Sequence, residues 1–128
     1  MSVKIFLAIL AILAVAFGVG FLVAPAALGS VYGTQNTPTS ELMARFFGDA
    51  LLGWGLILWF ARNFDGAPLR FVLLATGVAD VVAVVFAAES VMAGVVNAIG
   101  WSTVLIYLFG AVGSFYFLMA GPHQTTTS

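Results

Sequence analysis

Three ionisable side chains lie inside apolar stretches of the chain, where they could carry chemistry. Arg45 and Asp49 stand one helical turn apart in the segment ARFFGDALLGWGLILWFAR (residues 44–62), and Asp80 lies in the next apolar stretch. An ionised group in the middle of a bilayer costs roughly 2.5–3.5 kcal/mol on insertion scales, so such groups usually face a protein interior and pair. Carboxylates in that setting exchange protons, bind cations or hold polar headgroups.

The two carboxylates are expected at the same depth in the membrane. Asp49 precedes the turn at residues 63–68, and Asp80 follows it, by nearly equal numbers of residues, and a helix rises ~1.5 Å per residue. We therefore predict a buried polar cluster of Arg45, Asp49 and Asp80 between the second and third helices, with the Thr76 hydroxyl joining it. Three roles stay open: a clamp between two helices, a functional polar site, or a contact with a partner subunit.

The composition indicates an integral membrane protein. Of 128 residues, 62% are hydrophobic and 7% charged, whereas soluble domains carry roughly a quarter charged residues. The excess apolar surface must face hydrocarbon. Four Lys and Arg against five Asp and Glu provide no basic surface for a phosphate backbone, so no nucleic-acid partner is expected.

Four apolar segments each reach the ~20 residues that cross a bilayer. They are residues Ile5 to Ala24, Glu41 to Ala61, Leu69 to Ala88 and Ala98 to Ala120. They predict an all-α fold, a four-transmembrane-helix antiparallel bundle in up-down-up-down order. One domain is expected over residues 1–120, with a polar C-terminal tail at 121–128 and a polar loop at 25–39. The first segment exceeds the ~7–15 apolar residues of a signal peptide, so we expect it to be retained.

Small residues spaced by four predict where the helices pack, because backbones in lipid associate through close approach. The second and third segments carry such residues at Ala44 and Gly48, and at Ala75, Ala79, Ala83 and Ala87.

Positive charges in the short loops predict the orientation. Lys4 flanks the first segment, and Arg62 and Arg70 flank the second loop, whereas the first and third loops hold no Lys or Arg. We expect a multi-pass protein of the inner (cytoplasmic) membrane with both termini in the cytoplasm.

No residue set for catalysis, a metal or a cofactor is visible. The chain has no cysteine, and its one histidine, His123, belongs to the polar tail, so thiolate, iron–sulfur and haem ligand sets are not expected. Tyr107 and Ser114 of the fourth segment and Trp54 of the second are expected to line a cavity beside the acids, or to pack in the core. The chain is not predicted to be an enzyme.

The segment at residues 44–62, with an arginine before an aromatic-glycine step and with spaced glycines, resembles small four-helix bacterial membrane proteins of the DoxX-like kind. It is also similar to related families of unknown function. The resemblance covers the four-span layout over nearly the whole chain and implies a partnership with quinone-dependent or other membrane redox complexes. The absence of cysteine departs from the thiol-based members.

Three functions follow from these observations. The first is an accessory or scaffold subunit, or a binder of a small lipophilic molecule, with the bilayer, another membrane protein or a second copy as partner. The alternative is a small oligomeric proton-coupled transporter that uses Asp49 and Asp80. The third is a quinone-linked oxidoreductase component whose cleft is lined by Tyr107 and Trp54.

Overall fold

The computed structural model describes residues 1–120, which form helices and no strand. The helices are α1 (Val3–Val23), α2 (Pro25–Val31), α3 (Pro38–Ala61), α4 (Gly66–Met92) and α5 (Gly100–Ala120). All except α2 are long and apolar enough to cross a membrane, which confirms the all-helical class and is compatible with an integral membrane protein. The polar tail predicted at 121–128 lies outside the described residues.

The polar loop predicted at 25–39 contains the short helix α2. Pro25 occupies its first turn, where the fixed φ of proline suits a helix and its missing N–H is not needed. Gly33 follows α2 with a φ of 74°, a left-handed conformation that ends helices. At the start of α3, Thr37 and Ser40 each accept a hydrogen bond from the other's backbone N–H, at 3.1 and 2.8 Å, which forms a capping box.

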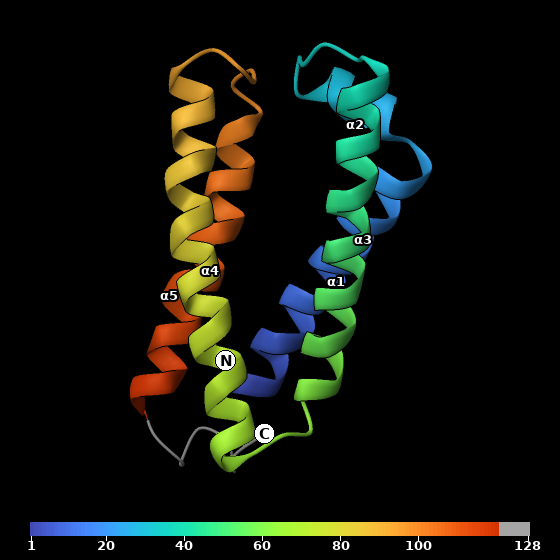
Figure 1. The fold of residues 1–128 in the computed structure, drawn as a ribbon. Coiled ribbons are helices and arrows are strands. Elements are labelled where there is room, and N and C mark those ends of the chain that lie inside the picture. Colours follow the sequence, from blue (N-terminus) through green and yellow to red (C-terminus); the bar gives the residue numbers. More distant parts are fainter. Residues whose placement is uncertain (121–128) are drawn as a thin grey trace.

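The four long helices form two pairs. Helix α1 packs along α3 and α4 packs along α5, whereas few residues join the two pairs. Figure 1 shows these pairs as two columns, with the N-terminus, the α3–α4 turn and the end of α5 at one end of the molecule and α2 at the other. The expectation that α3 and α4, the second and third predicted segments, pack against each other along their length is therefore wrong.

Glycines bring the backbones of α1 and α3 into contact. A Cβ added at Gly18 would lie 2.8 Å from the Gly48 carbonyl oxygen, and one at Gly48 would lie 2.6 Å from the Gly18 carbonyl oxygen. Further along, a Cβ at Gly55 would lie 3.0 Å from the Val15 nitrogen. Helices in lipid associate through such close approach, so the glycine face of α3 is occupied by α1 and is not available to α4.

Helices α4 and α5 pack through a different set of residues from those predicted. Ala75 and Ala79 are exposed, so the seam expected along the alanines of α4 is wrong there. Gly77 is buried instead, and a Cβ at this position would lie 2.9 Å from the Phe115 ring. The Phe115 ring of α5 therefore packs on Gly77, and this contact takes the place of the alanine seam expected there.

The two pairs meet in a hydrophobic core at the end that holds the N-terminus. Helix α1 provides half of it, and the other three long helices provide the rest. Its buried members are Val3, Phe6, Leu7, Leu10, Ala11, Leu58, Ala61, Leu69, Leu73 and Phe117.

Hydrogen bonds join the two pairs at the opposite end. The Tyr32 hydroxyl, just after α2, bonds with Thr103 Oγ1 of α5 at 2.7 Å. Asn97, in the link before α5, donates its side-chain amide to the Val31 carbonyl at 2.9 Å and its backbone N–H to the Tyr32 carbonyl at 2.8 Å. We call Tyr32, Asn97 and Thr103 the polar clasp. Because the pairs are held at both ends, the space between them is bounded along the molecule.

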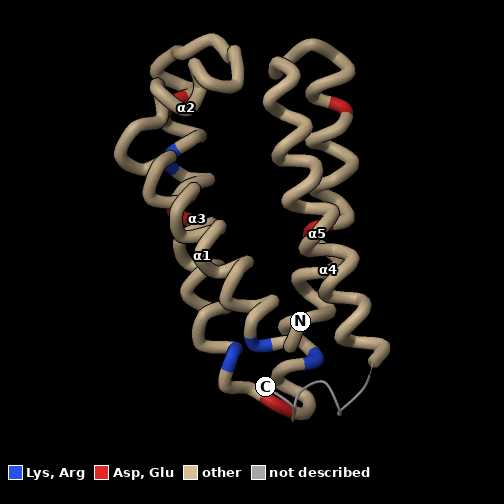
Figure 2. The backbone as a smooth tube through the Cα atoms, turned by 180° about the vertical axis from the view of Figure 1, so that it is seen from behind, with Lys and Arg blue, Asp and Glu red and all other residues tan. Residues whose placement is uncertain are grey.

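Basic residues gather at the end that holds the N-terminus (Figure 2). The Arg62 guanidinium stacks 3.5 Å from the centroid of the Trp59 ring, and its Nε donates to the Trp59 carbonyl at 2.9 Å. Arg70 donates to the Leu118 carbonyl at 3.2 Å, which satisfies a carbonyl at the end of α5 that the helix itself leaves free.

Candidate functional site

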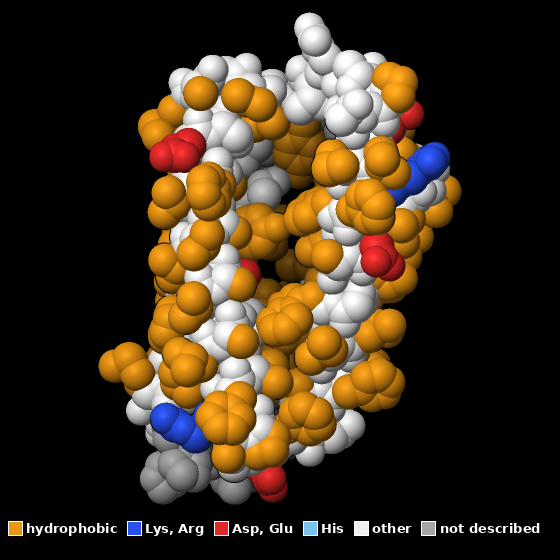
Figure 3. Space-filling view, in the orientation of Figure 1, with side chains coloured by type: hydrophobic (Ala, Val, Ile, Leu, Met, Phe, Trp, Pro, Cys, Tyr) orange, Lys and Arg blue, Asp and Glu red, His pale blue; other side chains and the backbone are white. Residues whose placement is uncertain are grey.

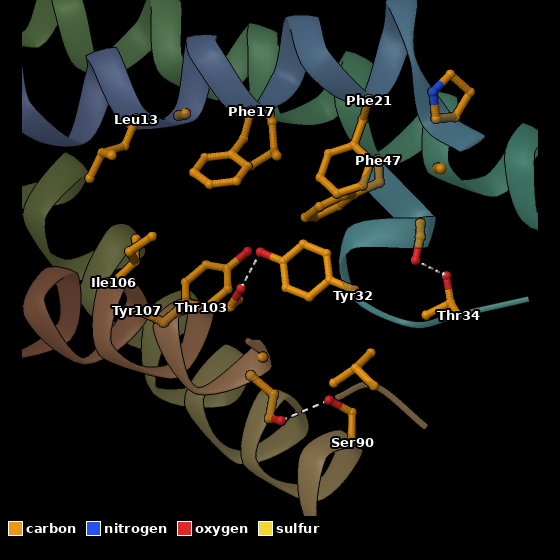
Figure 4. Close-up of a pocket in the computed structure, with 18 of the residues that line it drawn as sticks. Leu13, Phe17, Phe21, Tyr32, Thr34, Phe47, Ser90, Thr103, Ile106 and Tyr107 are labelled. Carbon is orange, nitrogen blue, oxygen red and sulfur yellow. Dashed lines mark hydrogen bonds between the residues drawn. The ribbon is translucent and has the colours of Figure 1, made fainter. Parts of the chain in front are cut away.

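A cavity of about 340 Å³ lies between the two helix pairs, and all five helices contribute to its lining. Helices α1 and α3 form an apolar wall rich in aromatic side chains, which we call the aromatic wall. It consists of Leu13, Phe17, Phe21, Phe47, Leu51 and Trp54. Figure 4 shows the phenylalanine rings of this wall facing Tyr32, Thr103 and Tyr107 across the cavity.

Across the cavity from this wall lie polar groups of α4, of α5 and of the residue that follows α2. They include Tyr32, Thr76, Asp80, Thr103 and Tyr107. In Figure 4 the Tyr32 and Tyr107 hydroxyls point toward each other, and Tyr32 is bonded to Thr103. Tyr32 and Thr103 of the clasp are thus part of the lining, and the aromatic wall faces polar groups across the cavity.

Acidic groups are the only charged side chains that line the cavity within the described residues. Asp80 and Glu41 are both half-buried lining residues, and no Lys, Arg or His belongs to the lining. Asp80 Oδ2 lies against the Cα of Gly110 on α5, because a Cβ added there would overlap it. Glycine at 110 therefore makes room for the carboxyl group between α4 and α5.

Thr76 lines the cavity one turn before Asp80 and is almost completely buried. Its exposed fraction is 1%, and its Oγ1 has no hydrogen-bond partner. A buried hydroxyl without a partner costs about 1–3 kcal/mol. Thr76 therefore carries an acceptor and a donor that a bound molecule can satisfy.

The predicted buried cluster of Arg45, Asp49 and Asp80 is wrong. Arg45 and Asp49 are exposed and do not line the cavity, and Asp80 is only half-buried. Counting residues from the turn places Asp49 and Asp80 along their helix axes, but it does not give the rotation of either helix about its own axis. Because the glycine face of α3 is packed on α1, Arg45 and Asp49 lie on the side of α3 turned away from the cavity.

The residues predicted as cavity lining have separate outcomes. Tyr107 and Trp54 line the cavity. Ser114 does not line it, and is fully buried with no partner for its hydroxyl. Sequence reasoning missed the aromatic wall, although Phe17 and Phe21 stand one turn apart, because phenylalanines in a span are equally typical of lipid-facing positions.

Within the described residues there is no group of three or more His, Cys, Asp and Glu side chains that could hold a metal ion. The chain matches no protein-family model, no curated protein and no solved structure. The likeness to DoxX-like proteins therefore stays a prediction, and a function has to be argued from the cavity.

Thr76→Val is expected to stabilise the ligand-free protein by about 1 kcal/mol, because valine has the same shape and removes an unsatisfied hydroxyl. Thr103→Val is the matched control, since the Thr103 hydroxyl is bonded to Tyr32, and it is expected to destabilise the protein. Denaturant unfolding in detergent measures both. A Thr76→Val chain that loses as much stability as Thr103→Val would show that the Thr76 hydroxyl has a partner.

Proposed function

We propose that this protein binds a small lipophilic molecule inside the membrane, in the cavity between the two helix pairs. The observation that carries the proposal is the cavity itself, whose volume of about 340 Å³ lies in the ~300–1,000 Å³ range of small-molecule sites. Protein interiors are close-packed, and an unfilled space forfeits contact energy. A bundle with only a scaffolding role would gain stability by closing it.

The ligand would reach the cavity from the bilayer. Few residues of α3 and α4 contact each other, and Figure 1 shows the two helices converging toward the turn that joins them. The space-filling view shows an opening between the two columns, with an acidic side chain visible at it (Figure 3). A molecule dissolved in lipid can enter sideways through such an opening without crossing a polar surface. The apolar side chains around the opening favour this route.

The proposal includes an orientation and a division of roles. We place the protein in an inner membrane with its long helices in up-down-up-down order and both termini in the cytoplasm, because Lys4, Arg62 and Arg70 gather at one end (Figure 2). The cavity then lies toward the opposite face. Asp49 is not a lining residue, so the polar contact with the ligand falls to Asp80 and its neighbours rather than to a pair of acids.

Ala44→Phe is expected to abolish ligand binding, because Ala44 lines the cavity and a phenyl ring there would fill it. Ala50→Phe is the matched control, since Ala50 lies on the same helix, is exposed and lines no part of the cavity. Native mass spectrometry of the protein released gently from its own membrane reports a bound small molecule directly. We expect the molecule on the wild-type and Ala50→Phe chains and not on Ala44→Phe. Equal retention by all three would contradict the proposal.

A further inference from the structure

We propose that the cavity takes a lipophilic amine in its protonated form, with the ammonium group beside Asp80 and Thr76 and the apolar part against the aromatic wall. This inference rests on the proposed function and adds the charge and chemical class of the ligand. It is carried by the charge of the lining and by the positions of two side chains on α4.

The charge of the lining selects the sign of the ligand. Asp80 and Glu41 line the cavity, and no cationic side chain does so among the described residues. Electrostatic interactions are strong where water is excluded, so a cation gains attraction and an anion meets repulsion. Fatty acids and phosphorylated lipids would bring a negative group to a site that offers no positive partner.

The two polar groups of α4 are spaced to hold one ammonium. Thr76 and Asp80 are four residues apart, which places their Cβ atoms about 5–6 Å apart on one helix face, and both line the cavity. Thr76 is 1% exposed, and its buried Oγ1 lacks a partner. An ammonium has three N–H donors and no acceptor, so it can donate to the Asp80 carboxylate and to the Thr76 hydroxyl oxygen at once.

The aromatic wall suits the remainder of such a ligand. Its phenylalanines face Tyr32 and Tyr107 across the cavity (Figure 4), and Trp54 also lines the cavity. These rings offer both apolar contact and ring faces that attract a cation. A molecule with one ammonium and one hydrophobic body matches both sides. A purely apolar molecule would leave Asp80 and Thr76 unsatisfied.

The test compares two probes of equal length, 4-phenylbutylamine and 4-phenylbutan-1-ol, of which only the amine is charged at neutral pH. Each is used to displace radiolabelled 4-phenylbutan-1-ol from the purified full-length protein in detergent. We expect the amine to compete about tenfold better than the alcohol with the wild-type chain. Asp80→Asn should remove this preference, so that the amine and the alcohol then compete equally well, and Asp49→Asn, the control on the outer face, should keep it.

The outcomes separate this inference from the function on which it rests. If the alcohol binds saturably and the amine competes no better, the ligand class is wrong and the cavity remains a lipophilic site. If neither probe shows saturable binding, the proposed function fails as well. A preference that persists in Asp80→Asn would overturn the role of Asp80.

Thr76→Val provides a second variant that does not depend on the folding of Asp80→Asn. Here the amine is compared with its trimethylammonium analogue, which has the charge but no N–H donor. We expect Thr76→Val to weaken the binding of the primary amine severalfold relative to that of the analogue. An equal effect on both, or on neither, would contradict the placement of the ammonium at Thr76.

Discussion

Gly48→Ala is expected to destabilise the protein by at least about 2 kcal/mol, although alanine is normally the better helix former. The added Cβ would lie 2.6 Å from the Gly18 carbonyl oxygen, 2.9 Å from Phe21 Cβ and 3.0 Å from the Leu22 nitrogen. Two of these atoms belong to the backbone of α1 and cannot rotate away. Overpacking of this kind costs about 1–3 kcal/mol or more, and here it would separate α1 from α3.

Gly53→Ala is the matched control for this prediction. Gly53 lies on the same helix with nothing within 4 Å of an added Cβ, so only helix propensity acts there, and alanine should stabilise α3 by up to about 1 kcal/mol. Unfolding by sodium dodecyl sulfate, followed by circular dichroism, measures both variants. Two glycine-to-alanine changes on one helix should therefore shift the midpoint in opposite directions. Equal shifts would contradict the close crossing of α1 and α3.

Phe6→Ala is expected to destabilise the protein by about 3 kcal/mol, because Phe6 joins the two helix pairs. Its side chain is almost completely buried, and its ring centroid lies 5.4 Å from those of both Phe109 and Phe117 on α5. It also fills the space beside Gly113, where an added Cβ would meet the ring. Removing a buried phenylalanine typically costs 3–5 kcal/mol, and lipid that enters the gap would reduce this loss.

Phe71→Ala is the control, since Phe71 is 69% exposed on α4 and should change stability by less than about 0.5 kcal/mol. The same detergent unfolding compares the two variants. A Phe6→Ala chain as stable as Phe71→Ala would show that the pairs do not meet through this ring.

The sequence predicts the membrane spans far better than it predicts which helices pack against each other. Apolar length alone is enough to find four long helices, and Gly48 is correctly expected at a packing seam. Which helix covers that seam depends on the fit of glycines to backbone in three dimensions. Gly18 and Gly55 complete the fit on α1 and α3, and no spacing rule within one segment shows that they match.

The candidate site shows the same division. Tyr107 and Trp54 are predicted as lining because polar and aromatic groups in a span favour an interior position. The predicted cluster of Arg45, Asp49 and Asp80 is wrong because the packing of glycines on α1 fixes the rotation of α3. Arg45 and Asp49 then lie on the side of α3 turned away from the cavity that Asp80 lines. The polar clasp depends on Asn97 contacting residues more than sixty positions away, which no local pattern indicates.

Fluorescence quenching of Trp54 tests most directly whether the cavity holds a lipophilic molecule. With Trp59 and Trp101 replaced by phenylalanine, Trp54 is the only tryptophan and lines the cavity, whereas a chain that keeps only the exposed Trp101 reports the surrounding detergent. A brominated phenylalkane should quench Trp54 in a saturable manner and Trp101 in proportion to its concentration. Quenching of Trp54 that rises in the same unsaturated way as that of Trp101 would contradict a binding cavity between the two helix pairs.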